Sequence, residues 1–280
     1  MKVLKLNDSG NDVCYLQRLL QEQGFTVKES GIFDSTTQQA AISFQCKHGL
    51  TADGITGFRT WESLLFEKRD KDMDDSITNE DYERIAYLLD IEPASIKAIQ
   101  EVETGGKGGF FAPGRPAILF EGHIFWNQLK KRGLNPEQYI KGNENILFPK
   151  WDKSHYKKGL EEYARLEQAK QINLEAAYCS ASWGMFQIMG FNHGACGMKS
   201  VTDFVKMMSK SELSQLRLLA IFIMSQKSNR IPDNPSLYLI SALRAKDWAN
   251  FARLYNGPQY AQNNYDTKIA TAYRKYASQQ

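Results

Sequence analysis

The sequence predicts a mainly α-helical protein of two domains, and three observations lead to this fold class. Apolar residues recur at helical spacing through most of the chain. Capping residues and glycines mark where these segments begin and end. A run of charges at residues 67–75, with Met73 as its single apolar residue, separates two regions of different composition. We interpret the segment 67–77 as a solvated linker between a domain at 1–66 and a domain at 78–280. The alternative is a charged helix end.

The first region predicts three short helices. Residues 11–23 carry an apolar face and follow the turn-forming sequence Asp8-Ser9-Gly10. Asp34 is expected to cap a second helix, and residues 60–65 begin a third. The expected inward positions of the first two helices are Val13, Leu16, Leu19, Leu20, Ala40, Ala41 and Phe44. This region contains no set of residues suited to catalysis.

Composition limits the classes of function. The chain has 280 residues, of which 42% are hydrophobic and 24% charged, as in ordinary globular proteins. It has no apolar run approaching ~20 residues, so we expect no membrane span. The start lacks an apolar signal region, so we expect no secretory signal. Of the net charge of +3, residues 1–70 carry −1 and residues 71–75 carry −2, which leaves +6 for residues 76–280. That charge suits an anionic polymer (nucleic acid, membrane surface or cell wall), or is scattered solubilising charge.

The cysteines and histidines do not form a ligand pattern. The four cysteines lack CxxC spacing, and we expect them to be reduced and mostly buried. His193 and Cys196 have the spacing of half a metal site, but the remaining histidines supply no second half. We therefore predict neither a metal nor a cofactor.

The second region contains a carboxylate in an informative position. Residues 92–95 open a helix, with Pro93 suited to its first turn, and Gly105-Gly106 end it. On this helix Ile96, Ile99 and Glu103 form one stripe, whereas Glu101 falls four residues after Lys97 on the solvent side. A carboxylate at the end of a buried stripe is desolvated, which raises its pKa as a general acid requires. The alternative is a Glu103 exposed at a frayed helix end.

Further helices are expected at about residues 202–228, 235–254 and 265–278. Their Met and aromatic stripes are most simply explained as core, with the three helices packed as a bundle behind the site.

A characteristic succession of residues runs through the first region. It consists of Leu6, Gly10, Val13, Leu16-Gln17, Leu20, Gly24, Gly31, Phe33-Asp34, Thr37, Ala40, Phe44-Gln45, Gly49-Leu50, Asp53-Gly54, Gly57, Thr60-Trp61 and Leu64. With this succession, residues 3–66 resemble the three-helix peptidoglycan-binding module of cell-wall enzymes. The resemblance implies adhesion to peptidoglycan, at its peptide stem, without catalysis.

The second region resembles the lysozyme superfamily. Glu103-Thr104, Gly184-Met185-Phe186-Gln187 and Tyr255-Asn256-Gly257 are similar, in order, to three elements of goose-type lysozymes and lytic transglycosylases. Over residues 78–280 the chain is closer still to the N-acetylmuramidase domain of modular phage endolysins. The segments that carry this likeness are 102–106, 115–116, 118–123, 180–193, 247–248 and 255–258. The resemblance implies a lysozyme-like helical domain.

The resemblance also implies roles for particular residues. Glu103 is the expected acid. Glu121, after the apolar residues 117–120, is a candidate base, or else a structural partner of Arg115 or His123. The expected contacts to substrate are Ser182, Trp183, Phe186, Gln187, Asn192, Tyr255, Asn256 and Tyr265. Among these we expect the aromatic rings to stack on sugars, and the glycines around Gln187 to let the backbone approach the glycan closely.

These expectations describe a monomeric phage endolysin that hydrolyses the β-1,4 bond between N-acetylmuramic acid and N-acetylglucosamine. We expect it to be made in the host cytoplasm and to act in the periplasm and cell wall after another protein permeabilises the membrane. The alternatives are a lytic transglycosylase, which forms 1,6-anhydro ends, and a non-catalytic wall-binding protein. A nucleic-acid partner is not expected, because the chain shows no recognition motif.

Overall fold

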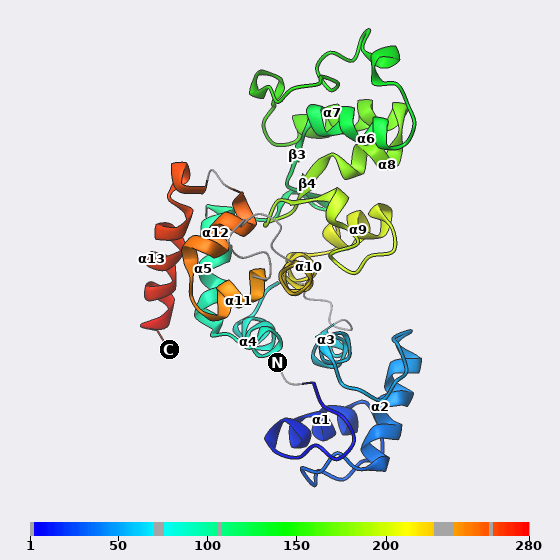
Figure 1. Cartoon of the computed structure of the whole chain (residues 1–280), viewed down its shortest axis with the longest axis vertical. Helices are drawn as coiled ribbons and strands as arrows, with labels where there is room; N and C mark the ends of the chain where they lie inside the picture. The colour runs from blue at the N-terminus through cyan, green and yellow to red at the C-terminus, as the bar shows by residue number, and fades with distance from the viewer. Residues whose placement is uncertain (1–2, 70–75, 106–107, 227–237, 258–259, 280) are drawn as a thin grey trace. The chain divides into compact units, whose positions relative to one another are not determined.

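Helices make up most of the chain, as the sequence predicts. The computed structural model describes residues 3–69, 76–105, 108–226, 238–257 and 260–279. These residues fall into two compact units, Met1–Asp74 with Tyr87–Asp90, and Asp75–Ala86 with Ile91–Gln280 (Figure 1). Of the expected linker at 67–77, residues 70–75 lie outside the described part of the chain.

The N-terminal unit contains the three helices that the sequence predicts. They are α1 (Asn11–Glu22), α2 (Ser35–Lys47) and α3 (Phe58–Phe66). The side chain of Asp34 accepts a hydrogen bond from the backbone N–H of Thr37 and caps α2 as expected. All seven positions assigned to the inward faces of α1 and α2 are buried, and Phe33 and Trp61 complete the core between the helices.

Two buried glutamines organise this unit in the same way. Gln17 on α1 donates to the hydroxyl of Thr37 at 3.0 Å, and its oxygen accepts from the N–H of Gly31 at 3.0 Å. Gln45 on α2 donates to the hydroxyl of Thr60 at 3.1 Å, and its oxygen accepts from the N–H of Gly54 at 2.9 Å. Each amide thus holds the loop and the first turn that follow its own helix, and satisfies buried backbone groups there.

The C-terminal unit contains ten helices among its described residues, α4 included, although the end of α4 groups with the first unit. They are α4 (Asn79–Leu89), α5 (Pro93–Thr104), α6 (Gly122–Lys131), α7 (Glu161–Ile172), α8 (Leu174–Cys179), α9 (Val201–Met208), α10 (Glu212–Ser225), α11 (Leu239–Arg244), α12 (Trp248–Asn256) and α13 (Tyr265–Ala277). Short 3-10 turns lie at Pro136–Tyr139, Lys153–His155, Gly190–Asn192 and Tyr260–Asn263. The strands are β1 (Phe110–Ala112), β2 (Arg115–Pro116), β3 (Ile118–Phe120), β4 (Ala181–Trp183) and β5 (Ile188–Met189).

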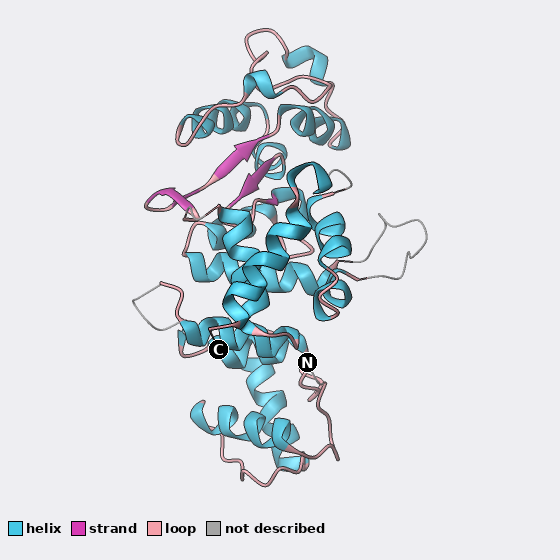
Figure 2. Cartoon of the chain, turned by 90° about the vertical axis from the view of Figure 1, so that its left-hand side faces the viewer, coloured by secondary structure: helices cyan, strands magenta, loops and turns pink. Residues whose placement is uncertain are grey.

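A small antiparallel sheet lies between two groups of helices within this unit. β1 pairs with β2, and a three-stranded sheet has the order β3-β4-β5. In both ribbon views α6, α7 and α8 lie on one side of β3 and β4, while α5, α10, α12 and α13 lie on the other (Figures 1 and 2). Helix α5 packs along α13, which in turn packs against α12. The sheet therefore separates the helix that carries Glu103 from the group α6–α8.

Local signals place both ends of α5 where the sequence predicts. Pro93 occupies its first turn after the extended residue Glu92, and Gly105 ends it in the left-handed conformation at φ 54°. Before α4, the hydroxyl of Thr78 accepts from the N–H of Asp81, whose carboxylate accepts from the N–H of Thr78 at 3.0 Å. This reciprocal pair caps α4.

Two of the three long helices expected near the C-terminus are each divided in two. The first is broken at residues 209–211, where Ser211 caps α10 by accepting from the N–H of Ser214. The second is broken before α12, where Lys246 has φ 56° and Asp247 accepts from the N–H of Asn250. Ser211 and Asp247 begin a new helix in each case, because their side chains accept from backbone N–H groups of its first turn. Residues 227–228 of the first expected segment and 235–237 of the second lie outside the described part of the chain.

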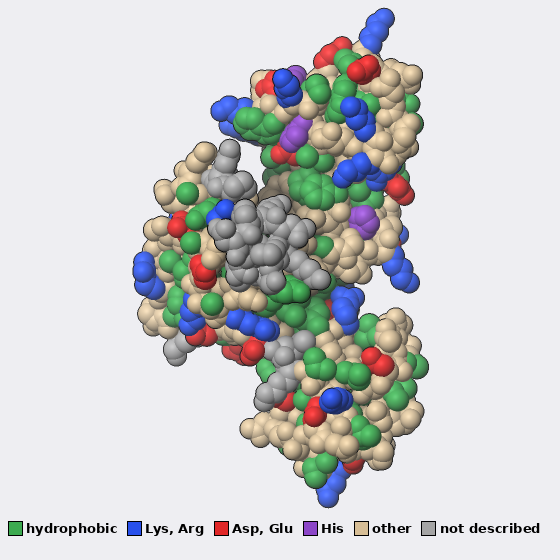
Figure 3. All heavy atoms as spheres, viewed as in Figure 1, with side chains coloured by type: hydrophobic (Ala, Val, Ile, Leu, Met, Phe, Trp, Pro, Cys, Tyr) green, Lys and Arg blue, Asp and Glu red, His purple; other side chains and the backbone are tan. Residues whose placement is uncertain are grey.

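The prediction for the cysteines is correct only in part. All four are free, but Cys46 is exposed and Cys14 half-buried, whereas Cys179 and Cys196 are buried. Among the described residues, no three His, Cys, Asp or Glu side chains gather as a metal site would require. None of the described helices is long and apolar enough to cross a membrane. On the face shown in Figure 3, basic side chains lie scattered among acidic and uncharged ones.

Candidate active site

Glu103 lies in the last turn of α5, at the end of a buried stripe. Ile96 and Ile99 on the same stripe are fully buried, and the Glu103 side chain is half-buried. Burial raises the pKa of Glu103 to about 7, because the charged form loses its hydration there. A hydrogen bond from Asn256 partly opposes this rise. Glu103 therefore keeps its proton to a higher pH than an ordinary glutamate and is still reachable from solvent.

Three residues that the sequence predicts for the site surround this carboxylate. Nδ2 of Asn256 donates to Oε1 of Glu103 at 3.0 Å. The pKa values of Tyr255 and Tyr265 are both raised, mainly by burial and secondly by the negative charge of Glu103. Asn256 ends α12 and Tyr265 begins α13, so helix termini far apart in sequence meet at the end of α5. The hydroxyl of Thr104 donates to the carbonyl of Gln100 at 2.8 Å, back along its own helix.

Glu101 faces away from this cluster. Its carboxylate accepts from Nζ of Lys275 at 2.6 Å and from the hydroxyl of Tyr276 at 2.7 Å, both on α13. These contacts lower the pKa of Glu101. The solvent-side position is as expected, but the expected pair with Lys97 is wrong, because Lys97 donates to Asn79 instead. Glu101 and Glu103 are thus only two residues apart on α5, yet the pKa of Glu101 is lowered and that of Glu103 is raised.

Gln187 lies in the tight turn between β4 and β5, and its side chain serves the turn itself. It is exposed and has φ 47°, a left-handed conformation that is uncommon outside glycine. Its oxygen accepts from the hydroxyl of Ser182 at 2.6 Å, and its Nε2 donates to the carbonyl of Gly184 at 2.8 Å. The turn is tied to α12, because the hydroxyl of Tyr255 donates to the carbonyl of Phe186 at 2.9 Å. Tyr255 and Asn256 therefore connect this turn to Glu103.

Gly184 and Gly190, on either side of Gln187, are required by internal packing. The expected role of the glycines in approaching a sugar stays a prediction. Gly184 has φ 72°, and a Cβ there would lie 2.7 Å from the side chain of Gln215. At Gly190 a Cβ would lie 2.0 Å from the carbonyl oxygen of Tyr178. Gln215 on α10 accepts from the N–H of Met185 at 2.7 Å, so a buried amide holds the turn from behind.

The register of the sheet separates Ser182 from Trp183. Leu119 pairs with Ser182, which pairs with Met189, so these three side chains share one face. The opposite face carries only buried side chains, namely Ile118, Phe120, Ala181, Trp183 and Ile188. Trp183 is 1% exposed, and its indole N–H donates to the carbonyl of Tyr178 at 3.1 Å. The expectation that Trp183 stacks on a sugar is therefore wrong, and so is the same expectation for Phe186, which is 2% exposed.

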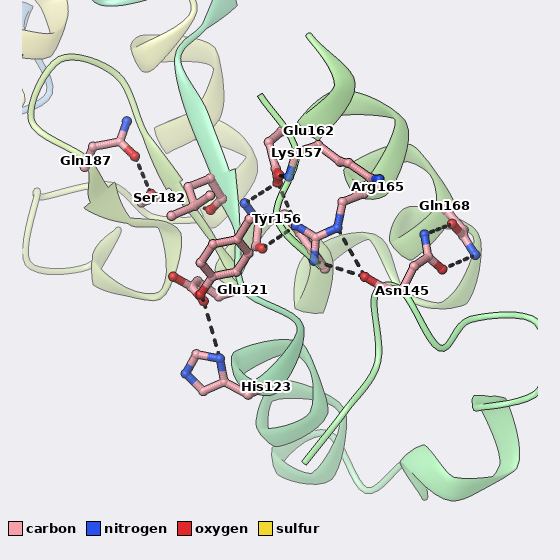
Figure 4. A network of polar contacts seen from close by, with 12 residues as sticks. Glu121, His123, Asn145, Tyr156, Lys157, Glu162, Arg165, Gln168, Ser182 and Gln187 are labelled. Atoms are coloured by element: carbon pink, nitrogen blue, oxygen red, sulfur yellow. Dashed lines mark hydrogen bonds and ion pairs between the residues drawn. The ribbon is translucent and has the colours of Figure 1, made fainter. Parts of the chain in front are cut away.

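Glu121 continues the face that carries Ser182. Its N–H donates to the carbonyl of Ser180 at 2.9 Å, which extends the strand pairing by one residue. In Figure 4 the Tyr156 ring lies across Glu121, and His123 lies on the other side. The Tyr156 hydroxyl donates to Oε2 of Glu121, which is 3.4 Å from Nδ1 of His123. The predicted partner His123 is present, whereas Arg115 lies over the Tyr163 ring instead.

Tyr156 is a site residue that the sequence did not reveal. It comes from the segment between the 3-10 turn Lys153–His155 and α7, thirty-five residues after Glu121. Behind it, Arg165 and Glu162 form a buried ion pair at 2.8 Å, and Arg165 also donates to the carbonyl of Asn145 (Figure 4). The only signal was the number of aromatic residues between positions 148 and 156, which has no helical or strand period.

Asn192 lines a small cavity together with three other predicted residues, one of which is the buried Phe186. Asn192 ends the 3-10 turn Gly190–Asn192 and lines a cavity of about 160 Å³ together with Gln187 and Tyr255. A larger hollow of about 1530 Å³ lies along α5, α13 and the start of α4. Glu101 lines this larger hollow, and Glu103 is not among its described lining residues. The residues on either side of Glu103, Val102 and Thr104, do line this larger hollow.

Comparisons with known proteins match two separate segments of the chain to family profiles. The N-acetylmuramidase family profile matches residues 92–277, and the profile of a peptidoglycan binding domain matches residues 9–64. The crystal structure of the Burkholderia AP3 phage endolysin is 38% identical, with a TM-score of 0.63, and the match covers 99% of this chain and 100% of that one. N-acetylmuramoyl-L-alanine amidase CwlM of Mycobacterium tuberculosis is 47% identical over 58 residues, which are 20% of this chain. That match spans only 14% of the amidase.

Proposed function

The chain belongs to the N-acetylmuramidase family, and on this premise we propose that Glu103 is the general acid that protonates the leaving oxygen of the glycosidic bond. The enzyme is a peptidoglycan-hydrolysing endolysin. The observation that carries the proposal is a half-buried carboxylate at the end of α5, with its pKa raised to about 7 and an amide donor 3.0 Å away. Such a group holds a proton at the pH where it has to give it up.

The reaction is the cleavage of the β-1,4 bond between N-acetylmuramic acid and N-acetylglucosamine. Bond breaking develops positive charge on the sugar and requires a proton at the leaving oxygen, which Glu103 supplies. Glu121 is the candidate base for the attacking water, since it lies on the sheet face shared with Ser182 and is oriented by Tyr156. Gln187, Asn192, Tyr255, Asn256 and Tyr265 complete the substrate contacts in this proposal.

The N-terminal unit holds the enzyme on peptidoglycan by its peptide stem. The match of residues 9–64 to a peptidoglycan binding domain supports this role. The unit fixes the catalytic region near its polymeric substrate, which raises the local substrate concentration without new contacts at the active site. Removal of residues 1–66 should weaken pelleting with insoluble peptidoglycan while leaving cleavage of soluble glycan fragments intact.

The similarity to a phage endolysin supports a proposal for where the enzyme acts. It is made in the host cytoplasm as a monomer, and it reaches the periplasm and cell wall once the inner membrane is permeabilised. Expression in cells with and without a membrane-permeabilising protein tests this, because lysis should require that protein. Sedimentation of the purified protein tests the monomer.

The decisive test of the acid compares two neighbouring glutamates. Glu103→Gln should abolish the clearing of a purified peptidoglycan suspension, with a loss of roughly 10²–10⁴-fold. Glu101→Gln, two residues away and paired with Lys275, should keep the wild-type rate. Full lysis by Glu103→Gln would refute the assignment. Mass spectrometry of the products should show hydrolysed reducing ends, and 1,6-anhydro ends would instead identify a transglycosylase.

A further inference from the structure

A single aromatic ring stands exposed beside the network around Glu121. The side chain of Trp151 is 60% exposed, whereas those of Trp61 and Trp183 are each 1% exposed. Isolated exposed apolar side chains are common on protein surfaces and by themselves indicate nothing. Two further observations distinguish Trp151, namely the order of its loop and its connection to Glu121.

The loop that carries Trp151 is held by its own side chains. The carboxylate of Asp152 accepts from the N–H of Ser154 at 2.8 Å and lies 3.7 Å from Nε2 of His155. The His155 ring stacks on Phe148, with centroids 4.5 Å apart. Because these contacts fix the backbone on the C-terminal side of Trp151, its exposure is a feature of an ordered loop.

Trp151 is also connected to the sheet. Its ring meets the Tyr156 ring edge-on, with centroids 6.5 Å apart and an angle of 76°. The Tyr156 hydroxyl in turn donates to the carboxylate of Glu121. Glu121 shares its sheet face with Leu119 and Ser182, so the exposed indole lies at the end of a continuous set of contacts that begins at the candidate base.

We propose that Trp151 is a stacking platform for a pyranose ring of the glycan strand, in a subsite next to Glu121. This inference rests on the function proposed above. A pyranose presents an apolar C–H face to an aromatic ring and a rim of hydroxyls to polar groups. The exposed indole fits the apolar face of the sugar. The exposed polar residues Asp152, Lys153 and Ser154, which follow the indole, fit its hydroxyl rim. A protein partner would instead favour a continuous apolar patch, and the four residues that follow Trp151 are polar or charged.

The experiment is a titration in the Glu103→Gln background, which prevents cleavage. The probe is the β-1,4-linked tetramer of N-acetylglucosamine, and binding is followed by calorimetry and by tryptophan emission. Trp151→Ala should raise the Kd roughly tenfold, the ratio that corresponds to about 1.4 kcal/mol. Trp151→Phe keeps a ring and should raise the Kd less. Leu160→Ala, a side chain 46% exposed before α7, is the matched control and should leave the Kd unchanged.

The emission change isolates the indole itself. The tetramer should shift the emission of the Glu103→Gln protein, and Trp151→Phe should remove most of that shift even if Trp151→Ala does not fold. Equal Kd values for Trp151→Ala and its parent, or an emission change that survives Trp151→Phe, would overturn the inference. A self-association abolished by Trp151→Ala, with unchanged sugar binding, would also overturn it and identify a second copy as the occupant.

The two proposals fail separately. Lysis by Glu103→Gln at the wild-type rate would remove the assigned acid, while the titration would still decide whether Trp151 binds sugar. If Glu103→Gln lost lysis while Trp151→Ala left sugar binding unchanged, Glu103 would remain the assigned acid. Trp151 would then not be a stacking platform.

Discussion

Asn256 gives Glu103 a hydrogen bond of 3.0 Å through Nδ2, while its own Oδ1 is buried and has no hydrogen-bond partner among the described residues. An orphaned buried acceptor is costly, and the cost is tolerated here at the one amide that contacts the carboxylate. The hydrogen bond stabilises the ionised form of Glu103 against burial, which favours the neutral form. The pKa of about 7 is the balance of these two effects.

Asn256→Leu should therefore shift the pH dependence of lysis. Without the amide donor only burial acts on Glu103, so its pKa rises above about 7. The alkaline limb of the kcat/KM profile should move upward by roughly half to one pH unit. Asn263→Leu, an exposed residue of the 3-10 turn before α13, is the matched control and should leave the limb in place. A limb that stays or moves downward in Asn256→Leu would exclude this role.

At alkaline pH the folded state of the Glu103→Gln variant should be more stable than that of the wild type. The folded pKa of Glu103 is raised, so its stabilising effect is complete below the unfolded pKa near 4.5 and is lost as the pH rises towards 7. A glutamine does not titrate. The advantage of the variant should therefore grow between pH 4.5 and 7 and then level off, on the order of 2–3 kcal/mol at most. Urea denaturation at pH 4, 6 and 8 measures it.

The stability of the Glu101→Gln variant, relative to the wild type, should depend on pH in the opposite direction. The pKa of Glu101 is lowered by Lys275 and Tyr276, so the carboxylate contributes stability above the unfolded pKa, and this is lost as the pH falls. The variant should be less stable than the wild type at pH 7, with the difference vanishing at acidic pH. If both variants showed the same pH dependence, the two glutamates would not have the environments described here.

The buried carboxylate of Glu103 could be predicted because its signal is local. Eight residues of α5, from Ile96 to Glu103, contain the stripe that buries it, and Pro93 and Gly105 mark the helix ends. The same kind of local reasoning could have excluded Trp183. Adjacent residues in a strand point to opposite faces, so Ser182 and Trp183 cannot both face one ligand once residues 181–183 form a strand. The missing information was the strand itself, which the helical interpretation of the chain did not include.

Other parts of the site depend on contacts between distant segments, which periodicity does not report. Tyr156 reaches Glu121 from a loop, and Gln215 reaches the turn at Met185 from α10. Gln215 carried a weak signal, as an amide in the mostly apolar segment from Leu213 to Ile223. Buried polar side chains are retained where they satisfy backbone groups, and Gln17 and Gln45 of the N-terminal unit follow the same rule.

The role of Glu121 can be separated from that of its partner. Glu121→Gln should lower the hydrolytic rate by roughly 10²-fold or more, because the amide is not a base for water. Tyr156→Phe should cause a smaller loss, since it keeps the carboxylate but removes the hydroxyl that orients it. Tyr163→Phe removes a hydroxyl that donates to the carbonyl of Pro116, and it serves as the control. Full activity of Glu121→Gln in initial-rate assays would make Glu121 structural.

Gln187 combines a left-handed backbone with a side chain that satisfies the buried Ser182, and substitutions should separate the two effects. Gln187→Ala keeps the unfavourable φ of 47° and loses the hydrogen bond from Ser182. Gln187→Gly loses the same bond but relieves the backbone, so it should be more stable than the alanine variant by about 1 kcal/mol. Ser182→Ala should recover part of the lost stability in the alanine background, because the hydroxyl there keeps only its long contact of 3.5 Å to the carbonyl of Leu119. Chemical denaturation of all three measures this, and an alanine variant at least as stable as the glycine variant would show that the turn adopts another conformation in solution.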